Sequence, residues 1–154
     1  MPANRQAARR RSSSRLGRAL KRAFMQAHIA LYRLSGGLLG RRFGRQSFLL
    51  LTTTGRKSGR ARVTPLFYLP KGDDFMLIAS NWGTATDPNW WQNLQAHPRA
   101  QVRIGQKTLT VSARQAGSEE RARLWPFITA RYPNFANYQR GITREIPVVL
   151  LTPT

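Results

Sequence analysis

The sequence predicts a mainly β protein with α-helical insertions (α+β), in which about six strands form a small antiparallel barrel behind an N-terminal helix. Short runs of β-branched and large apolar residues are separated by turns that contain Gly and Asp, which is typical of antiparallel hairpins. Helix signals are confined to the N-terminus and a few connections, so helices do not alternate with strands as in a doubly wound sheet. The 154 residues are enough to bury one core.

The N-terminal region carries two patterns. Residues 1–15 hold only Arg as charged residues and nothing large to bury, which predicts a disordered basic arm. Residues 16–35 place apolar side chains at steps of three and four, which predicts an amphipathic basic helix that ends at Gly36 and Gly37. Its apolar stripe consists of Leu16, Leu20, Phe24, Ala27, Leu31 and Leu34. Such a helix can lie on an anionic membrane surface, or it can cap the barrel or a dimer.

Residues 45–154 are expected to form the barrel domain. The expected strands are residues 48–54, 62–69, 74–80, 100–104, 107–114 and 146–152. Pro65 indicates a strand edge or a bulge, because proline cannot donate to a ladder.

Two helical signals interrupt these strands. Asp87 is expected to cap a short helix with Pro88 at its first position, and this helix stops at Pro98. Ser118, followed by two glutamates, is expected to begin a second helix, which Pro126 kinks or restarts.

The charge of the chain is strongly unbalanced. Lys and Arg number 26 against 6 Asp and Glu, and the net charge of +20 indicates an anionic partner. Of the 26 basic residues, 16 lie at or before Arg62, whereas the first acidic residue is Asp73. The anionic partner is therefore expected to meet the N-terminal part of the chain.

Several classes of site find no support in the composition. The chain has no Cys, so disulfides, thiol nucleophiles and thiolate metal sites are excluded, which is compatible with a reducing cytoplasm. Its two histidines have no acidic residue close in sequence, so no metal site is expected. No apolar run approaches the roughly 18 residues of a membrane span. We expect a cytoplasmic protein that can lie peripherally at the inner face of the cell membrane.

The segment "TTTGRKSGRAR" (residues 52–62) gathers cations in a turn. Gly55 and Gly59 allow a tight turn with exposed N–H groups, and the side chains between and after them can donate to phosphate or carboxylate oxygens. The spacing of a P-loop is absent, so nucleoside triphosphate hydrolysis is not indicated. A solvated hairpin tip would use the same residues, and the sequence alone leaves both interpretations open.

Four motifs, "LLLTTTGRKSGRARVTPLFYL", "IASNWG", "DPNWWQNL" with "HPR", and "REIPVVLLT", resemble the deazaflavin-dependent nitroreductase family over residues 45–152. The resemblance implies a split β-barrel like that of FMN-binding proteins, and it implies coenzyme F420, with FMN a less expected alternative. The phosphodiester, lactyl carboxylate and oligoglutamate of F420 would be the anions that the cationic turn meets. The resemblance implies these coenzyme-binding residues: Arg56, Lys57, Ser58, Arg60, Arg62, Thr64, Pro65, Leu66, Ala79, Asn81 and Trp90.

The resemblance also implies an oxidoreductase that passes a hydride from the reduced deazaflavin to an acceptor. Menaquinone-like quinones, enones and nitroaromatics are the acceptor classes it implies, and Ser80, Tyr132 and Tyr138 are the catalytic candidates. Tyr132 and Tyr138 share a helical spacing with Phe135, which has no hydroxyl. Such a stripe is more often part of a core than of a site. The protein is expected to be a monomer or a homodimer.

Two other functions remain open from the sequence. A basic nucleic-acid-binding module would explain the charge, although no recognised nucleic-acid motif is present. A carrier that binds F420 without turnover would use the same turn as the enzyme.

Overall fold

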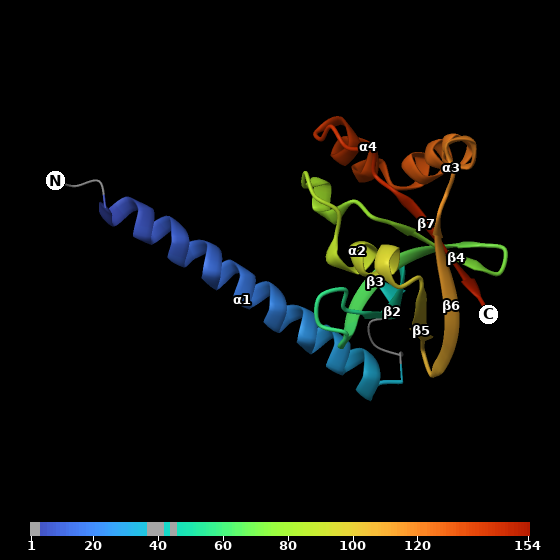
Figure 1. Cartoon of the computed structure of the whole chain (residues 1–154), viewed down its shortest axis with the longest axis horizontal. Coiled ribbons are helices and arrows are strands. Elements are labelled where there is room, and N and C mark those ends of the chain that lie inside the picture. Colours follow the sequence, from blue (N-terminus) through green and yellow to red (C-terminus); the bar gives the residue numbers. More distant parts are fainter. Residues whose placement is uncertain (1–3, 37–41, 44–45) are drawn as a thin grey trace.

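The structure is a computed structural model that describes residues 4–36, 42–43 and 46–154, with side chains over residues 17–36 and 46–154. A long helix, α1 (Asn4–Leu34), leads into a body of strands and short helices (Figure 1). Because α1 begins at Asn4, the prediction of a disordered arm is corrected for residues 4–15, and residues 1–3 lie outside the described part. Ala, Arg and Gln in this stretch are good helix formers, which explains why the helix extends through it.

Antiparallel strands form a closed barrel. The strands are β1 (Arg42–Phe43), β2 (Gln46–Thr54), β3 (Ala61–Lys71), β4 (Asp74–Ile78), β5 (Arg99–Ile104), β6 (Lys107–Gln115) and β7 (Val148–Pro153). Their order is β1-β2-β3-β4-β7-β6-β5, and the additional pairing of β2 with β5 closes six of them into a ring. The prediction of a six-stranded antiparallel barrel is confirmed, whereas the short β1 was not expected. Pro65 lies opposite Leu50, in the half of β3 that pairs only with β2 among the described strands.

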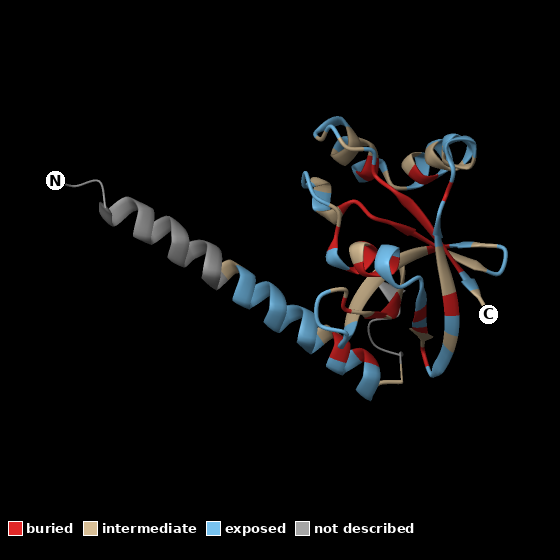
Figure 2. Cartoon of the chain, viewed as in Figure 1, coloured by how far each residue is buried: buried red, intermediate tan, exposed pale blue. Residues whose placement is uncertain are grey.

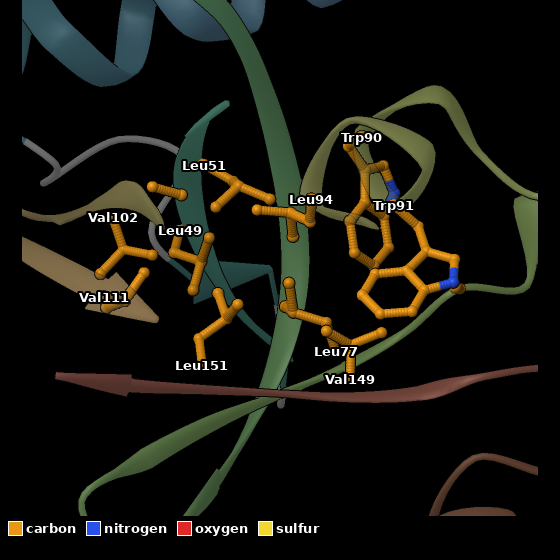
Figure 3. Packing of buried hydrophobic residues seen from close by; sticks show 12 residues of the cluster. Leu49, Leu51, Leu77, Trp90, Trp91, Leu94, Val102, Val111, Val149 and Leu151 are labelled. Atoms are coloured by element: carbon orange, nitrogen blue, oxygen red, sulfur yellow. The ribbon is translucent and has the colours of Figure 1, made fainter. Parts of the chain in front are cut away.

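Alternate residues of the strands supply two cores. One fills the barrel, where Leu49 and Leu51 of β2 meet Leu77, Val149 and Trp91 (Figure 3). The other lies on the outer face of β4 and β7, where the intervening positions pack against two helices, α3 (Ser118–Arg131) and α4 (Pro133–Arg140). The period of two residues along each strand thus divides the apolar side chains between both cores.

Among the helices in the body, α3 begins at Ser118 as expected, and the helix after Asp87 begins one position later than expected. Helix α2 (Asn89–Ala96) has Pro88 at its N-cap, and Asp87 makes no cap because its carboxylate accepts a hydrogen bond from Arg144 instead. Helix α3 runs through Pro126 without a restart, and the new helix begins at Pro133, where proline is tolerated in the first turn. A 3-10 turn, η1 (Asn81–Gly83), precedes α2.

Helix α1 contacts the barrel through a face other than its apolar stripe. Ile29 and Tyr32 are buried against Leu50, and the fully buried Tyr32 hydroxyl accepts a hydrogen bond of 2.8 Å from the Gly105 N–H. The stripe is exposed instead, with exposed fractions of 62% at Leu20, 76% at Phe24, 49% at Leu31 and 88% at Leu34 (Figure 2). The stripe therefore does not cap the barrel of its own chain. The Leu16 side chain lies outside the described residues.

In the part of the chain that the structure describes, no helix combines the length and the apolar character needed to cross a membrane.

Candidate functional site

Residues 55–62, which comprise the connection between β2 and β3 and the first two residues of β3, are called the basic turn below. Its backbone is closed by hydrogen bonds from the Gly55 N–H to the Arg60 carbonyl (2.8 Å) and from the Gly59 N–H to the Gly55 carbonyl (2.7 Å). Gly59 has a φ of +66°, which favours glycine, and a Cβ at Gly55 would lie 2.8 Å from the Ser58 Oγ. Ser58 Oγ accepts hydrogen bonds from the Arg60 N–H and the Arg62 guanidinium. The two glycines thus allow a tight loop that folds its serine inward.

The cations of the basic turn have neutral partners. Arg56 is half-buried, its N–H donates to the Asn93 Oδ1 at 3.1 Å, and its guanidinium donates to the side-chain oxygens of Asn89 and Asn93. Lys57, Arg60 and Arg62 are exposed, and none of these four cations forms an ion pair with an acid within the described residues. The turn therefore presents uncompensated positive charge, which can hold a phosphate or carboxylate group.

Helix α2 connects the basic turn to the second part of the site. The buried Asn93 donates to the Thr53 hydroxyl and accepts from Arg56, which fixes the turn against the helix. At the start of the helix, Gln92 donates to the Asp87 carbonyl at 2.7 Å. In Figure 1 the basic turn and the loop that contains η1 extend from the same side of the body, with α2 between them.

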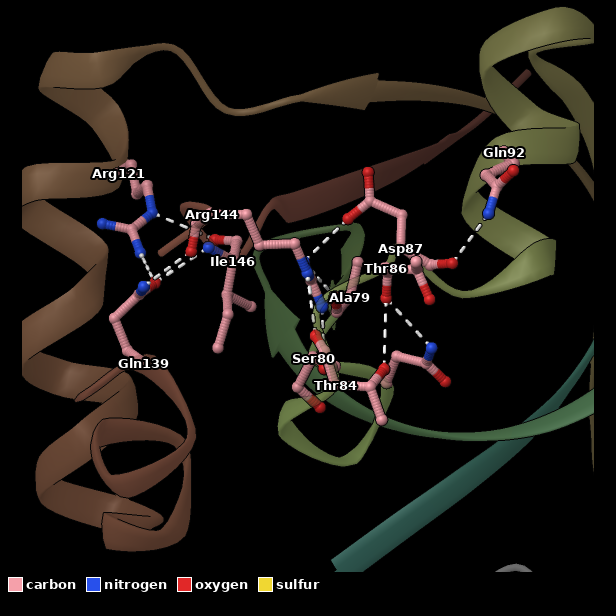
Figure 4. A network of polar contacts seen from close by, with 11 residues as sticks. Ala79, Ser80, Thr84, Thr86, Asp87, Gln92, Arg121, Gln139, Arg144 and Ile146 are labelled. Carbon is pink, nitrogen blue, oxygen red and sulfur yellow. Dashed lines mark hydrogen bonds and ion pairs between the residues drawn. The ribbon is translucent and has the colours of Figure 1, made fainter. Parts of the chain in front are cut away.

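Residues 79–87, called the η1 loop below, are held by one guanidinium. Arg144 Nη2 donates to the Ser80 carbonyl (2.9 Å), and its Nε donates to the Thr84 carbonyl (3.1 Å). Its Nη1 donates to the Ala79 carbonyl (3.2 Å) and to Asp87 Oδ1 (2.7 Å), and this last contact is an ion pair between half-buried groups (Figure 4). Four residues of this loop and Arg144 thus form one polar network.

A second layer of hydrogen bonds fixes Arg144 itself. Gln139 of α4 donates to the Arg144 carbonyl and accepts from the Ile146 N–H, both at 2.8 Å, and Arg121 of α3 donates to Gln139 and to the Ile146 carbonyl (Figure 4). Burial lowers the pKa of the Arg121 guanidinium, and Glu145, at 3.6 Å, opposes this shift. Both helices on the outer face of the sheet therefore position the η1 loop through Arg144.

Aromatic residues of α4 complete this side of the site. Tyr132 packs edge-on against Phe67 of β3 with ring centroids 4.6 Å apart, and Phe135 is buried between the two tyrosines. Tyr138 lies directly against Gly83, where a Cβ would come within 2.8 Å of its ring. The structure thus brings Tyr138 beside the loop that carries Ser80.

The predicted site residues outside the basic turn differ in how far they are buried. Thr64, Pro65 and Leu66 are half-buried on β3, Ala79 and Ser80 are buried, and Asn81 donates to the Thr86 carbonyl. Trp90 is buried in the barrel core with 6% of its surface exposed. Its ring therefore packs in the core beneath the start of α2 and is not part of a surface that is open to a ligand.

Sequence reasoning missed Arg144, Gln139 and Asn93. Arg144 stands in the motif "REIPVVLLT", where a cation directly before a buried strand was the available signal. Nothing local in the sequence pointed to the two amides, because their partners lie far away in the chain.

Comparison with known proteins identifies the family of the chain. A protein-family model described as F420H(2)-dependent quinone reductase matches residues 24–153. The chain belongs to this family. An F420H(2)-dependent quinone reductase of Mycobacterium tuberculosis is 38% identical over 132 residues, which cover 83% of this chain and 89% of that protein.

Two solved structures are similar to this chain. An F420-H2 dependent reductase (FDR-A) has 36% sequence identity and a TM-score of 0.61, and the match covers 68% of this chain and 92% of that one. A chain described as a domain-swapped dimer has 30% identity and a TM-score of 0.64, with 91% of this chain and 98% of that one covered. The split β-barrel, the F420-dependent reductase activity and F420 as the coenzyme are thereby confirmed. Activity on nitroaromatics stays a prediction.

The basic turn fits the anionic part of this coenzyme on its own chemistry. F420 carries a phosphodiester and carboxylates, and the turn offers uncompensated Arg and Lys donors beside a backbone kept open by Gly55.

Proposed function

We propose that the chain reduces a lipid-soluble, menaquinone-like quinone with F420, which the basic turn holds through its anionic groups. The observation that carries this proposal is the set of four cations in the basic turn: Arg56 and Arg62 donate to amide and hydroxyl oxygens, and none of the four has an acidic partner within the described residues. Family membership supplies the coenzyme and the acceptor class. Enones and nitroaromatics are further acceptors with the same electron-poor chemistry.

The residues of the site divide the work by position. Arg56, Lys57, Ser58, Arg60 and Arg62 bind phosphate and carboxylate oxygens in this proposal. Thr64, Pro65 and Leu66 on β3, with Ala79 and Asn81, form the wall against which a planar ring lies, and Trp90 supports that wall from the core. When bound, the reduced coenzyme supplies the hydride.

The part of the site that faces the quinone, called the acceptor side below, needs a proton donor. Reduction of a quinone to a hydroquinone takes up a proton in addition to the hydride. Tyr138 lies against the η1 loop, and Ser80 is one of the three residues of that loop whose carbonyls accept hydrogen bonds from Arg144. We assign the hydroxyls of Ser80, Tyr132 and Tyr138 to orienting the acceptor oxygen and donating to it as negative charge develops there. Phe135 supplies packing alone, because it has no hydroxyl.

Helix α1 can deliver the protein to a quinone dissolved in a membrane. Its apolar stripe is exposed, and Arg18, Lys21, Arg22 and Arg33 are exposed cations on the same helix. Each cation near an anionic surface contributes about 1 kcal/mol, which supports a peripheral location at the inner face of the cell membrane. A homodimer is the alternative use of the stripe, and the similarity to a domain-swapped dimer favours it.

Flotation with anionic liposomes separates these uses. The change Leu20→Ser with Phe24→Ser affects only exposed side chains, and so does its control, Ala19→Ser with Ala30→Ser. We expect the first variant alone to lose flotation. Light scattering after gel filtration measures the oligomeric state of the same variants. If Leu20→Ser with Phe24→Ser abolishes a dimer and leaves flotation unchanged, the membrane role is contradicted.

The activity is tested by titrating the purified chain with F420 and with FMN, then adding menadione to the reduced complex. F420 binding with menadione-dependent reoxidation is expected. F420 binding without reoxidation of the coenzyme would leave a carrier. Tight binding of single-stranded nucleic acid above about 0.3 M salt, with no coenzyme binding, would favour the nucleic-acid module.

A further inference from the structure

The turn at the tip of the η1 loop is strained. Asn81, Trp82 and Gly83 have φ angles of 47°, 58° and 74°, so three successive residues occupy the left-handed region and two of them carry a Cβ. This conformation is costly for a residue such as Trp, and strain of this kind concentrates at ligand-binding sites. Gly83 is required here for two reasons, its own φ and its close approach to the Tyr138 ring.

The contacts around the turn maintain this conformation. The Gly83 N–H donates to the Ser80 carbonyl at 3.0 Å, the Thr84 N–H donates to the Asn81 carbonyl at 3.2 Å, and Asn81 Nδ2 donates to the Thr86 carbonyl at 3.0 Å. The guanidinium of Arg144 joins the Ser80 and Thr84 carbonyls on either side of the turn. The position of residue 82 is therefore fixed before any ligand arrives.

This fixed position presents an indole to solvent. Trp82 is 83% exposed, whereas Trp90 and Trp91 are 6% and 4% exposed in the core. A rigid backbone thus holds a large, electron-rich ring outside every described hydrophobic cluster, two residues after Ser80 and next to the glycine that touches Tyr138. Strain and exposure are both unfavourable to the free protein, and a planar ligand that covers the indole would offset both.

We propose that Trp82 determines acceptor specificity by stacking its indole on the ring of an aromatic quinone. A quinone is planar and electron-poor, so an electron-rich indole is a complementary surface, and the ring contributes binding without taking part in the transfer of hydride or proton. The inference rests on the proposed function, since it takes Ser80 and Tyr138 as the acceptor side of the site.

The test uses Trp82→Gly and Trp82→Phe. Glycine suits the φ of 58°, so Trp82→Gly is expected to keep the fold and to raise the melting temperature, while it removes the ring. For menadione we expect the KM of Trp82→Gly to rise about 10-fold with kcat nearly unchanged, and Trp82→Phe to recover most of that loss. For cyclohexenone, which has no aromatic ring, the KM should change less than about twofold, since stacking is absent.

Phe127→Ala is the matched control, because Phe127 is an exposed aromatic residue (58%) on α3. It should leave both KM values unchanged. Calorimetric titration of menadione into the complex with oxidised F420 measures acceptor affinity without turnover, and Trp82→Gly should weaken it to the same extent as KM.

Equal affinities of wild type and Trp82→Gly for menadione would overturn this inference, and normal reductase activity would then leave the proposed function intact. Loss of F420 affinity in Trp82→Gly would also overturn it, because the turn would then belong to the coenzyme site. A wild-type chain that binds F420 but neither binds nor reduces menadione would overturn both proposals.

Discussion

The basic turn and the η1 loop, which both form hydrogen bonds with helix α2, reach their shapes by different means. The basic turn is built mostly from its own residues: Gly55 and Gly59 bend it, and Ser58 bonds to two arginines within four positions. The η1 loop depends on Arg144, whose partners lie 57 to 65 positions away. The first shape follows from local residues and the second from the completed fold.

This difference corresponds to two tasks. An anion can be held by several flexible cations, so the basic turn tolerates exposed Lys57 and Arg60. Hydride transfer requires reacting atoms at a fixed separation, so the acceptor side needs a backbone that does not move. The hydrogen bonds of Arg144 supply that rigidity, and substitutions in the two regions should therefore separate coenzyme binding from turnover.

The largest effect is expected from Arg144→Gln. The change leaves the carbonyls of Ala79 and Ser80 and the half-buried Asp87 carboxylate without their donor, which should cost about 2–4 kcal/mol of the free energy of unfolding. Urea denaturation measures this loss. We also expect kcat with menadione to fall about 100-fold, because the loop is no longer positioned, while F420 affinity falls less, because the basic turn keeps its contacts with the anionic groups of the coenzyme.

Arg140→Gln is the control for that change, since Arg140 is exposed at the end of α4 and bonds only to Asn137 among the described residues. It should leave stability and turnover unaltered. A stable Arg144→Gln protein with normal kcat would show that the guanidinium does not position the site.

Next in size is the double change Arg56→Ala with Lys57→Ala. It should weaken F420 binding by about 2–5 kcal/mol, because a partly buried charge contact to the phosphodiester is lost. The double change Arg99→Ala with Lys107→Ala, in exposed residues of β5 and β6, removes the same charge elsewhere. Fluorescence titration of both proteins separates a specific site from net charge, and equal weakening by the two pairs would place the anion outside the basic turn.

Much of the fold could be predicted from short-range patterns. The run of large apolar and β-branched residues in "FLLLTTT" marks β2, Pro65 marks the part of β3 that pairs on one side, and Ser118 with two glutamates marks the start of α3, since each rests on the chemistry of a residue and its near neighbours. The basic turn was predictable for the same reason. These features depend on the local sequence and not on the part of the fold that packs against it.

The errors concern residues whose partners are remote. Asp87 has the chemistry of an N-cap, but Arg144 takes its carboxylate. The apolar stripe of α1 was interpreted as a face for a membrane surface, for the barrel or for a dimer. It does not cover the barrel, because Tyr32, on another face, docks the helix through a hydroxyl that accepts from the Gly105 N–H 73 positions away. The left-handed φ of Trp82 has no sequence signal, because only its surroundings maintain it.

A smaller effect is expected from Tyr138→Phe. Loss of one hydroxyl should lower kcat with menadione by about 10-fold to 100-fold, at or below the lower end of the usual contribution of a positioned proton donor, because Ser80 and Tyr132 supply further hydroxyls. The melting temperature and F420 affinity should not change, because the ring keeps its packing against Gly83 and Phe135. Phe135→Tyr is the converse variant, which places a new hydroxyl in a buried position and should lower stability without raising kcat. An unaltered kcat in Tyr138→Phe would assign proton donation to Ser80 or Tyr132.

The smallest effect concerns Glu120, which lies at the start of α3 and distant in the chain from both regions. Hydrogen bonds from Arg114 lower the pKa of its carboxyl from 4.5, against the effect of burial, and Lys71 adds to this. Because the folded-state pKa is the lower one, the pair stabilises the protein fully above pH 4.5, and this contribution is lost as the pH falls through the folded-state value. Glu120→Gln should therefore lower the free energy of unfolding at pH 7 by about 0.5–1 kcal/mol, and the difference from wild type should shrink steadily in urea titrations at lower pH. Turnover at pH 7 should be the same in both proteins, and a difference there would mean that α3 transmits this contact to Arg144.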